Sequence, residues 1–198
     1  MPQEQPPDKR KILAFAGSTR TGSFNKKLVK IAVEGARAAG AEVTHIDLRD
    51  YPLPVYDGDL EEREGIPESG KRLKALFMAH QGLLISAPEY NSGISGVLKN
   101  AIDWVSRELP GEAPLACFDK KVAALMSASP GVLGGLRGLV HVRLILGNIR
   151  VLVLPQQIAV PRAHEAFQPD GSLKDAKQHA AIQKLGSDLT DILTKLYP

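Results

Sequence analysis

Five short runs with strand character alternate with helical segments along this 198-residue chain, and this alternation is the feature that most constrains its fold. A short, largely apolar run is typical of a strand that is covered on both faces of a parallel sheet. Apolar residues recur with helical spacing in the segments between the runs. We therefore expect a doubly wound parallel α/β sheet of strand order 2-1-3-4-5, with strands at 12–16, 42–46, 82–86, 122–126 and 150–154.

Helices are expected at 24–39, 68–80, 97–107 and 132–146, and a last helix is expected after Ser172. Ser172 and Asp175 have the spacing of a capping box, which marks the start of a helix. In the helix at 97–107 the apolar residues cover about 160° of the circumference, which is wider than a single core-facing stripe requires. We therefore expect this helix to pack against more than one partner.

Length and composition indicate one folded domain. At ~150 residues per domain the chain has room for a single core. Hydrophobic residues make up 43% of it and charged residues 24%, which excludes wholesale disorder. Residues 1–10 are rich in Pro, Gln and charge, so we expect them to form a disordered tail ahead of a domain at 11–198.

Charge and residue counts exclude several classes of partner. The net charge is +3 and is scattered, so no nucleic-acid partner is expected. No run approaches the ~20 apolar residues of a membrane span. The single cysteine, Cys117, allows no intrachain disulfide, and the five histidines lack the spacing of a metal site. We expect a cytoplasmic protein with no bound metal.

The loop after the first strand has the composition of an anion site. Residues 17–25 bring two glycines, four hydroxyls and Arg20 to the start of a helix, where backbone N–H groups lack partners. A phosphate ester is the expected guest. The loop is neither a Walker A nor a G-x-G-x-x-G motif. The alternative is an ordinary strand-to-helix turn rich in capping residues.

Two further loops follow the third and fourth strands. The loop at 87–96 contains Tyr90, which is suited to cover a flat ring. Because the first and third strands are neighbours in the expected order, this loop and the phosphate loop would flank one crevice. The loop at 127–135 is small and rich in glycine, so it would let backbone approach the same ligand. The alternative for residues 87–96 is an irregular loop with Tyr90 packed on the surface. The alternative for residues 127–135 is a flexible turn and helix start.

Two segments, Gly17–Asn25 and Pro88–Trp104, together resemble the NADPH-dependent FMN reductases, a family of flavodoxin-like proteins that includes bacterial quinone, chromate and azo-dye reductases. The resemblance extends from about residue 11 to the last helix. It implies a flavodoxin-like three-layer α/β/α fold and bound FMN. It also implies hydride transfer from NADPH or NADH through FMN to quinone-like, azo or metal-oxyanion acceptors by a ping-pong mechanism.

The same resemblance implies an oligomer and a set of cofactor contacts. Members of the family form dimers or tetramers with the flavin near a subunit interface, which would explain the wide apolar stripe at 97–107. No side chain is expected to act as a nucleophile or as a general acid or base, because the flavin carries the electron chemistry. Glu89 is expected to act through its backbone or by bracing its loop. The residues implied at the FMN phosphate are Ser18, Arg20, Ser23 and Asn25, and Phe24 is implied to bind the cofactor as well; those implied at the isoalloxazine ring are Pro88, Glu89, Tyr90 and Asn91, joined by Ser127, Ser129 and Gly131.

Two other functions compete with this interpretation. A flavodoxin-type electron carrier would also bind FMN without being an enzyme, although such carriers are usually acidic and this chain has a net charge of +3. A module that binds a phosphate ester without redox activity would be colourless. The absorbance of the purified protein separates the second alternative from the others.

Overall fold

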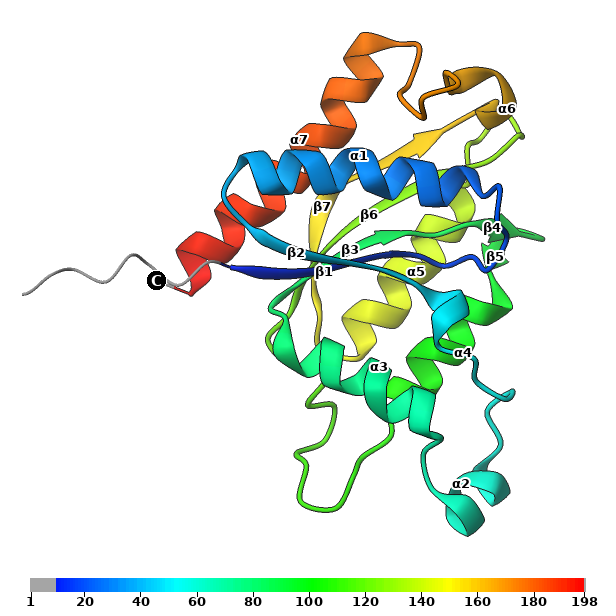
Figure 1. The fold of residues 1–198 in the computed structure, drawn as a ribbon, viewed down its shortest axis with the longest axis vertical. Coiled ribbons are helices and arrows are strands. Elements are labelled where there is room, and N and C mark those ends of the chain that lie inside the picture. Colours follow the sequence, from blue (N-terminus) through cyan, green and yellow to red (C-terminus); the bar gives the residue numbers. More distant parts are fainter. Residues whose placement is uncertain (1–9, 198) are drawn as a thin grey trace, which may run out of the picture.

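A five-stranded parallel sheet in the order β2-β1-β3-β6-β7 forms the centre of the computed structural model, which describes residues 10–197 (Figure 1). Counted along the chain, these are the second, first, third, fourth and fifth strands of the sheet, so the predicted order is confirmed. The tail expected at 1–10 lies outside the described residues except for Arg10, and it stays a prediction. The strands of the sheet are β1 (Lys11–Ala16), β2 (Glu42–Asp47), β3 (Gly82–Ser86), β6 (Val122–Ala128) and β7 (Leu152–Val160).

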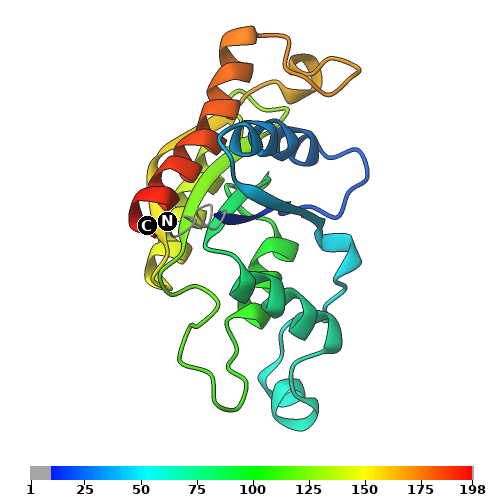
Figure 2. The same cartoon turned by 60° about the vertical axis from the view of Figure 1, so that its left-hand side comes forward.

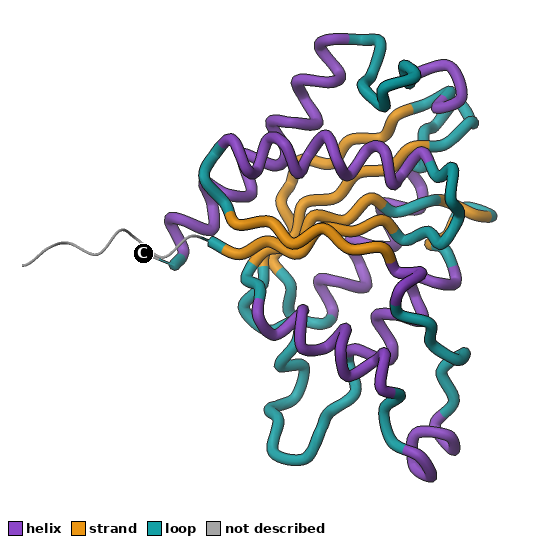
Figure 3. Tube along the Cα trace, in the orientation of Figure 1, coloured by secondary structure: helices purple, strands orange, loops and turns teal. Residues whose placement is uncertain are grey.

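Helices cover both faces of the sheet, which lies between two helical layers in Figure 3. One face carries α1 (Phe24–Ala38) and α7 (Ala176–Leu196). The other carries α3 (Glu68–Ala79), α4 (Gly96–Val105) and α5 (Leu136–Asn148). No helix within the described residues is long and apolar enough to cross a membrane.

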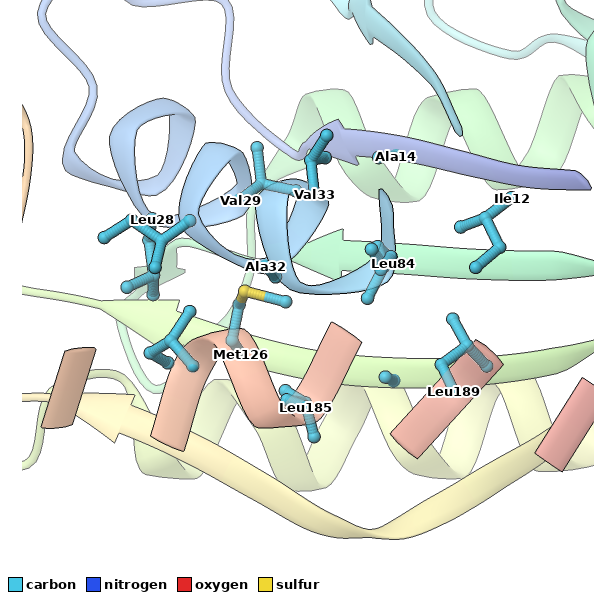
Figure 4. Close-up of a cluster of buried hydrophobic side chains, with 14 of the residues drawn as sticks. Ile12, Ala14, Leu28, Val29, Ala32, Val33, Leu84, Met126, Leu185 and Leu189 are labelled. Carbon is cyan, nitrogen blue, oxygen red and sulfur yellow. The ribbon is translucent and has the colours of Figure 1, made fainter. Parts of the chain in front are cut away.

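Each face of the sheet has its own hydrophobic core because successive strand residues point to opposite faces. Ile12, Leu84 and Met126 point toward α1 and α7 and form the first core with Leu28 and Leu189 (Figure 4). The neighbouring positions on the strands supply the second core beneath α3, α4 and α5; they include Leu13, Phe15, Leu83, Ile85 and Leu125.

Several short elements lie in segments that carry no clear periodicity. The hairpin of β4 (Glu89–Tyr90) and β5 (Gly93–Ile94) follows β3, and α6 (Ala163–Ala166) follows β7. Two more, a 3₁₀ turn at Leu48–Asp50 and α2 (Gly58–Glu64), lie in the connection expected to be a loop. No residue of α2 is buried, so it has no apolar stripe from which it could be predicted.

Three predicted boundaries are wrong. Strand β7 continues to Val160 because an irregularity between Ala123 and Leu125 shifts the register and lets its second half pair with the end of β6. Helix α5 begins at Leu136, four residues later than expected, because the two glycines before it have φ of 62° and 93°. The N-cap of α7 is Asp175, whose carboxylate accepts from two backbone N–H groups, and not Ser172.

The wide apolar stripe of α4 is covered by the chain itself. Trp104 is fully buried, and its Nε1 donates a hydrogen bond of 2.8 Å to the carbonyl of Pro54. The ring of Tyr56 meets the Trp104 ring edge-on at 5.1 Å between centroids. The second partner expected for this helix is therefore the segment that follows β2, and the stripe itself gives no sign of another subunit.

Helices α1 and α7 pack with their backbones in contact, and Figure 2 shows them against the same face of the sheet. A Cβ on Gly35 would lie 1.9 Å from the carbonyl oxygen of Gln183, and one on Gly186 would lie 2.0 Å from that of Ala32. Real side chains do not approach a backbone oxygen so closely, so each helix needs glycine at its crossing point. The approach fixes the separation of the two helices on this face of the sheet.

Gly186→Ala is expected to lower the free energy of unfolding by about 1–3 kcal/mol, the usual cost of overpacking. Alanine favours a helix by up to about 1 kcal/mol over glycine, but the added Cβ meets backbone that no rotamer change can move. Urea denaturation measures the change. Gly147→Ala in α5 is the control, because nothing lies within 4 Å of its added Cβ, and we expect that variant to be no less stable. Equal changes in the two variants would contradict the close packing.

Candidate functional site

Three loops meet at the carboxyl edge of the sheet and line an open cavity of about 190 Å³. They follow β1, β3 and β6, which are neighbours in the sheet, so their ends lie side by side near the β4–β5 hairpin (Figure 1). This edge is where doubly wound sheets bind ligands. The cavity is lined by Ser18, Arg20, Ser23, Phe24, Asn25, Pro88, Glu89, Tyr90, Ala128, Ser129 and Pro130.

The first loop is anchored at its start by close backbone contacts. The N–H of Gly17 donates to the carbonyl of Ser86 at 2.9 Å, and the Ser95 hydroxyl donates to the carbonyl of Gly17 at 2.6 Å. A Cβ on Gly17 would lie 2.9 Å from the Cβ of Leu98, so this position leaves no room for a side chain. The loop therefore leaves β1 in a path that is fixed by β3 and α4.

Beyond this anchor the loop presents donors suited to an anion. Ser23 precedes α1, but its hydroxyl does not cap the helix, so it is free to face the cavity. Arg20 is exposed at the rim and forms no ion pair with any of residues 10–197. The first N–H groups of α1 have no intrahelical acceptor, and the helix dipole adds positive potential there. Hydroxyls, N–H groups and a guanidinium together match the oxygens of a phosphate.

The side-chain amide of Asn25 ties this loop to two strands. Its oxygen accepts from the Ser86 hydroxyl at 2.8 Å and from the Ala128 N–H at 3.0 Å. Its nitrogen donates to the Ala128 carbonyl at 2.8 Å. Ser86 ends β3 and Ala128 ends β6, so one buried amide joins the starts of all three cavity loops. Asn25 lines the cavity as expected, and these bonds commit its polar atoms to the protein.

The second loop turns through the β4–β5 hairpin. Asn91 and Ser92 form its two-residue turn with φ of 50° and 65°, the sign that tight hairpin turns require. Pro88 and Tyr90 face the cavity, and the Tyr90 side chain is 61% exposed. Asn91 lies at the turn and is not among the lining residues, so the structure does not bring it to the site with its neighbours.

Glu89 braces this hairpin against α5. One carboxylate oxygen accepts from the Arg137 guanidinium at 3.1 Å, and the other accepts from the Gly138 N–H at 2.9 Å. Gly138 lies in the first turn of α5, where N–H groups lack helical partners. The Glu89 side chain is only 10% exposed, whereas Arg137 is 57% exposed. The expected bracing role of Glu89 agrees with this geometry.

The third loop contributes a smaller wall than expected. Ser129 lines the cavity, but Gly131 does not, and its N–H donates to the Ser129 hydroxyl at 3.3 Å. Ser127 does not point into the cavity. Its side chain lies on the face of β6 that carries α5, where its fully buried hydroxyl faces Gly135 and has no hydrogen-bond partner among the described residues. The sequence interpretation missed Ala128 and Pro130, whose only signal is their position beside Ser129.

The family model for NADPH-dependent FMN reductases matches residues 10–165. The chain belongs to the NADPH-dependent FMN reductase family. As a member it is an oxidoreductase that uses FMN and NAD(P)H, and the flavodoxin-like fold class is confirmed. The donor set of the first loop fits the phosphate that FMN carries.

Individual relatives of this FMN reductase extend the match over most of the chain. It is 36% identical over 179 residues to an NAD(P)H-dependent FMN reductase of Pseudomonas aeruginosa, covering 89% of this chain and 91% of the relative. A quinone reductase of Escherichia coli K12 is 36% identical over 147 residues, 74% of each chain. The structure of FerB, a flavoenzyme NAD(P)H:(acceptor) oxidoreductase from Paracoccus denitrificans, has a TM-score of 0.77 and 30% identity, covering 94% of this chain and 98% of that one.

Asn25→Ala is expected to lower the free energy of unfolding by about 2–4 kcal/mol, because buried groups left without partners cost about 1–3 kcal/mol each. The groups affected are the Ser86 hydroxyl and the N–H and carbonyl of Ala128. Ser129→Ala removes a hydroxyl that accepts one 3.3 Å bond at the same cavity, so it should cost less than about 1 kcal/mol. Urea denaturation compares the two variants, and a similar small loss for both would show that Asn25 does not hold the loops.

Proposed function

We propose that this FMN reductase passes electrons from NAD(P)H to quinone-like acceptors, and to azo compounds and metal oxyanions, by a ping-pong mechanism. The observation that carries the proposal is a cavity that the phosphate donor set of the first loop and the ring of Tyr90 both line. The quinone reductase of Escherichia coli K12, 36% identical to this chain, supports the choice of acceptor.

In this proposal each wall of the cavity has a separate task. Ser18, Arg20, Ser23 and the first N–H groups of α1 hold the FMN phosphate. Pro88 and Tyr90 orient the isoalloxazine ring, and Glu89 fixes their hairpin against α5. When bound, FMN accepts a hydride from the reduced nicotinamide and supplies both electrons to the acceptor. Coenzyme and acceptor approach through the same cavity, so they are expected to take turns.

Membership of a family of NAD(P)H-dependent reductases speaks against the flavodoxin-type electron carrier considered from the sequence. The surroundings of the cavity are basic, with Arg20, Lys26, Lys27 and Arg49 close to the first loop. This charge favours anionic small molecules, such as a nicotinamide coenzyme, over a role typical of acidic carriers. Steady-state turnover of NADPH and NADH with a panel of quinones separates the two functions, since a carrier would turn over neither coenzyme.

We also propose that the enzyme is a homodimer or homotetramer located in the cytoplasm. Leu136, Val140 and Leu144 repeat every four residues along α5 and are 44%, 48% and 67% exposed, an apolar face suited to a second copy. Val132 and Leu133 extend this face toward the cavity and are exposed as well. Light scattering after size-exclusion chromatography measures the mass. The free, buried Cys117 fits a reducing compartment.

The purified protein is expected to be yellow and to release FMN, not FAD, on heating, because the first loop offers a site for a terminal phosphate. Arg20→Ala should weaken FMN binding by about 1.5–3 kcal/mol, the usual value of a hydrogen bond to a charged group. Flavin fluorescence measures the dissociation constant. Arg63→Ala, which removes an exposed guanidinium from α2, is the control and should bind FMN like the unmodified protein. An unchanged constant for Arg20→Ala would remove Arg20 from the phosphate site.

Glu89→Gln is expected to change the anaerobic rate of FMN reduction by less than about tenfold, whereas a general acid or base contributes ~10²–10⁴-fold. Glutamine keeps the shape and an acceptor for the Gly138 N–H, and it loses only the ion pair with the half-exposed Arg137. Stopped-flow absorbance measures the rate. A loss of a hundredfold or more with flavin fully bound would show that Glu89 handles a proton or a charge.

A further inference from the structure

Arg20 lies in the middle of the first loop, and its neighbours face away from the cavity that it lines. Arg20 is among the residues around the cavity at the carboxyl edge of the sheet, whereas Thr19 and Thr21 are not. Thr21 and Thr19 line two other cavities, and Arg49 lines both of these. Arg49 therefore meets the loop from outside the site proposed for FMN.

The guanidinium of Arg49 binds the residues on both sides of Arg20. Its Nε donates to the carbonyl of Thr19 at 3.0 Å, and its Nη2 donates to the same carbonyl and, at 3.0 Å, to the hydroxyl of Thr21. The Thr19 carbonyl belongs to the planar peptide unit that ends at the nitrogen of Arg20. These hydrogen bonds consequently restrain the backbone from which the Arg20 side chain departs.

Arg49 itself projects from a well-anchored turn. It is the middle residue of the 3₁₀ turn Leu48–Asp50, which directly follows the edge strand β2 (Figure 1). The side chain of Leu48 is buried in the second core. The carboxylate of Asp47 caps the turn, because one of its oxygens accepts from the Arg49 N–H at 3.0 Å. The guanidinium therefore has a fixed base.

The carboxylate of Asp47 also ties this turn to the start of α1. Its second oxygen lies 2.5 Å from Nζ of Lys26, in the first turn of that helix. Burial alone would raise the pKa of Asp47, but the hydrogen bonds from Lys26 and from the Arg49 N–H hold it below its ordinary value. Asp47 is therefore ionised at neutral pH and occupied by these two donors, and the guanidinium of Arg49 bonds to the loop instead.

The middle of the first loop has little else to hold it. Its start is fixed at Gly17, and α1 is fixed at Asn25, but neither contact reaches residues 19–22. Within residues 10–197, the bonds from Arg49 are the only hydrogen bonds that join residues 19–22 to a residue outside the loop. Without them, the part of the loop that carries Arg20 would be attached only at its two ends.

We propose that Arg49 is a positioning residue for the FMN phosphate, because it holds Thr19 and Thr21 so that Arg20 stays directed into the cavity. The inference rests on the proposed function, which takes the first loop as the phosphate site. A loop that is already ordered before FMN arrives loses less conformational entropy on binding. A lysine at position 49 would keep the positive charge but would lack the rigid, planar set of donors.

The affinity test compares FMN with riboflavin, which lacks the phosphate. Flavin fluorescence should show that Arg49→Lys and Arg49→Gln each weaken FMN binding by about tenfold, whereas riboflavin binding changes by less than about twofold. Lys30→Gln removes a cation of α1 that has no hydrogen bond to the loop, and it should bind FMN like the unmodified protein. Unchanged FMN binding in Arg49→Lys would show that only charge matters, and equal losses for both flavins would show general damage; either result would overturn the proposal.

Trypsin tests the restraint on the loop without any flavin. Cleavage after Arg20 requires the loop to leave its fixed path, so mass spectrometry should find it several-fold faster in the full-length, FMN-free Arg49→Lys variant. This substitution leaves the number of trypsin sites unchanged. The Lys30→Gln variant should be cleaved after Arg20 at the rate of the unmodified protein. An equal rate in Arg49→Lys would contradict the restraint.

A double-mutant cycle tests whether Arg49 acts through Arg20. In the Arg20→Ala background, Arg49→Lys should weaken FMN binding by less than about twofold further, because the side chain that it positions is gone. Fully additive losses would overturn the proposal. An unchanged dissociation constant in Arg20→Ala would refute the proposed phosphate site as well, whereas an unchanged constant in Arg49→Lys beside a weakened Arg20→Ala would refute this inference alone.

Discussion

The three loops around the cavity at the carboxyl edge of the sheet depend on one buried amide. Asn25 accepts and donates hydrogen bonds across the ends of β3 and β6, so the start of α1 cannot move without breaking bonds to both strands. This arrangement explains how short, glycine-rich loops with little core of their own hold a fixed shape. The rigid part of the site is the sheet edge, and Asn25 transmits that rigidity to the donors proposed to meet the FMN phosphate.

The sequence predicted those features whose physical cause is local. Buried strands such as β3 were predicted because their sequences are short apolar runs. The anion-binding loop was predicted because residues 17–25 bring hydroxyls, glycines and Arg20 to the start of a helix. The convergence of the loops followed from the strand order alone. The same reasoning could not show that Ser127 faces α5, because the register of one residue decides which face of β6 it occupies.

Errors arose where distant residues decide the local structure. The sequence predicted the wide apolar stripe of α4, but not what packs against it. Trp104 is contacted by Pro54, 50 residues earlier in the chain, and no pattern within the helix reveals that contact. Asp175 takes the capping position because its carboxylate reaches two free N–H groups, whereas Ser172 bonds to Asp170. Lys26 of α1 likewise forms an ion pair with Asp47 at the end of β2, and only the parallel pairing of β1 with β2 makes the two neighbours.

The glycine contact between α1 and α7 makes the unit of folding longer than the segment that the family model matches. The family match ends at residue 165, yet α7 lies entirely beyond it and supplies Leu185, Leu189 and Leu193 to the core beneath α1. A chain cut at residue 165 would leave α1 bare on that side. The helix proposed to present its first turn to a phosphate is thus seated by a helix that the family model does not include.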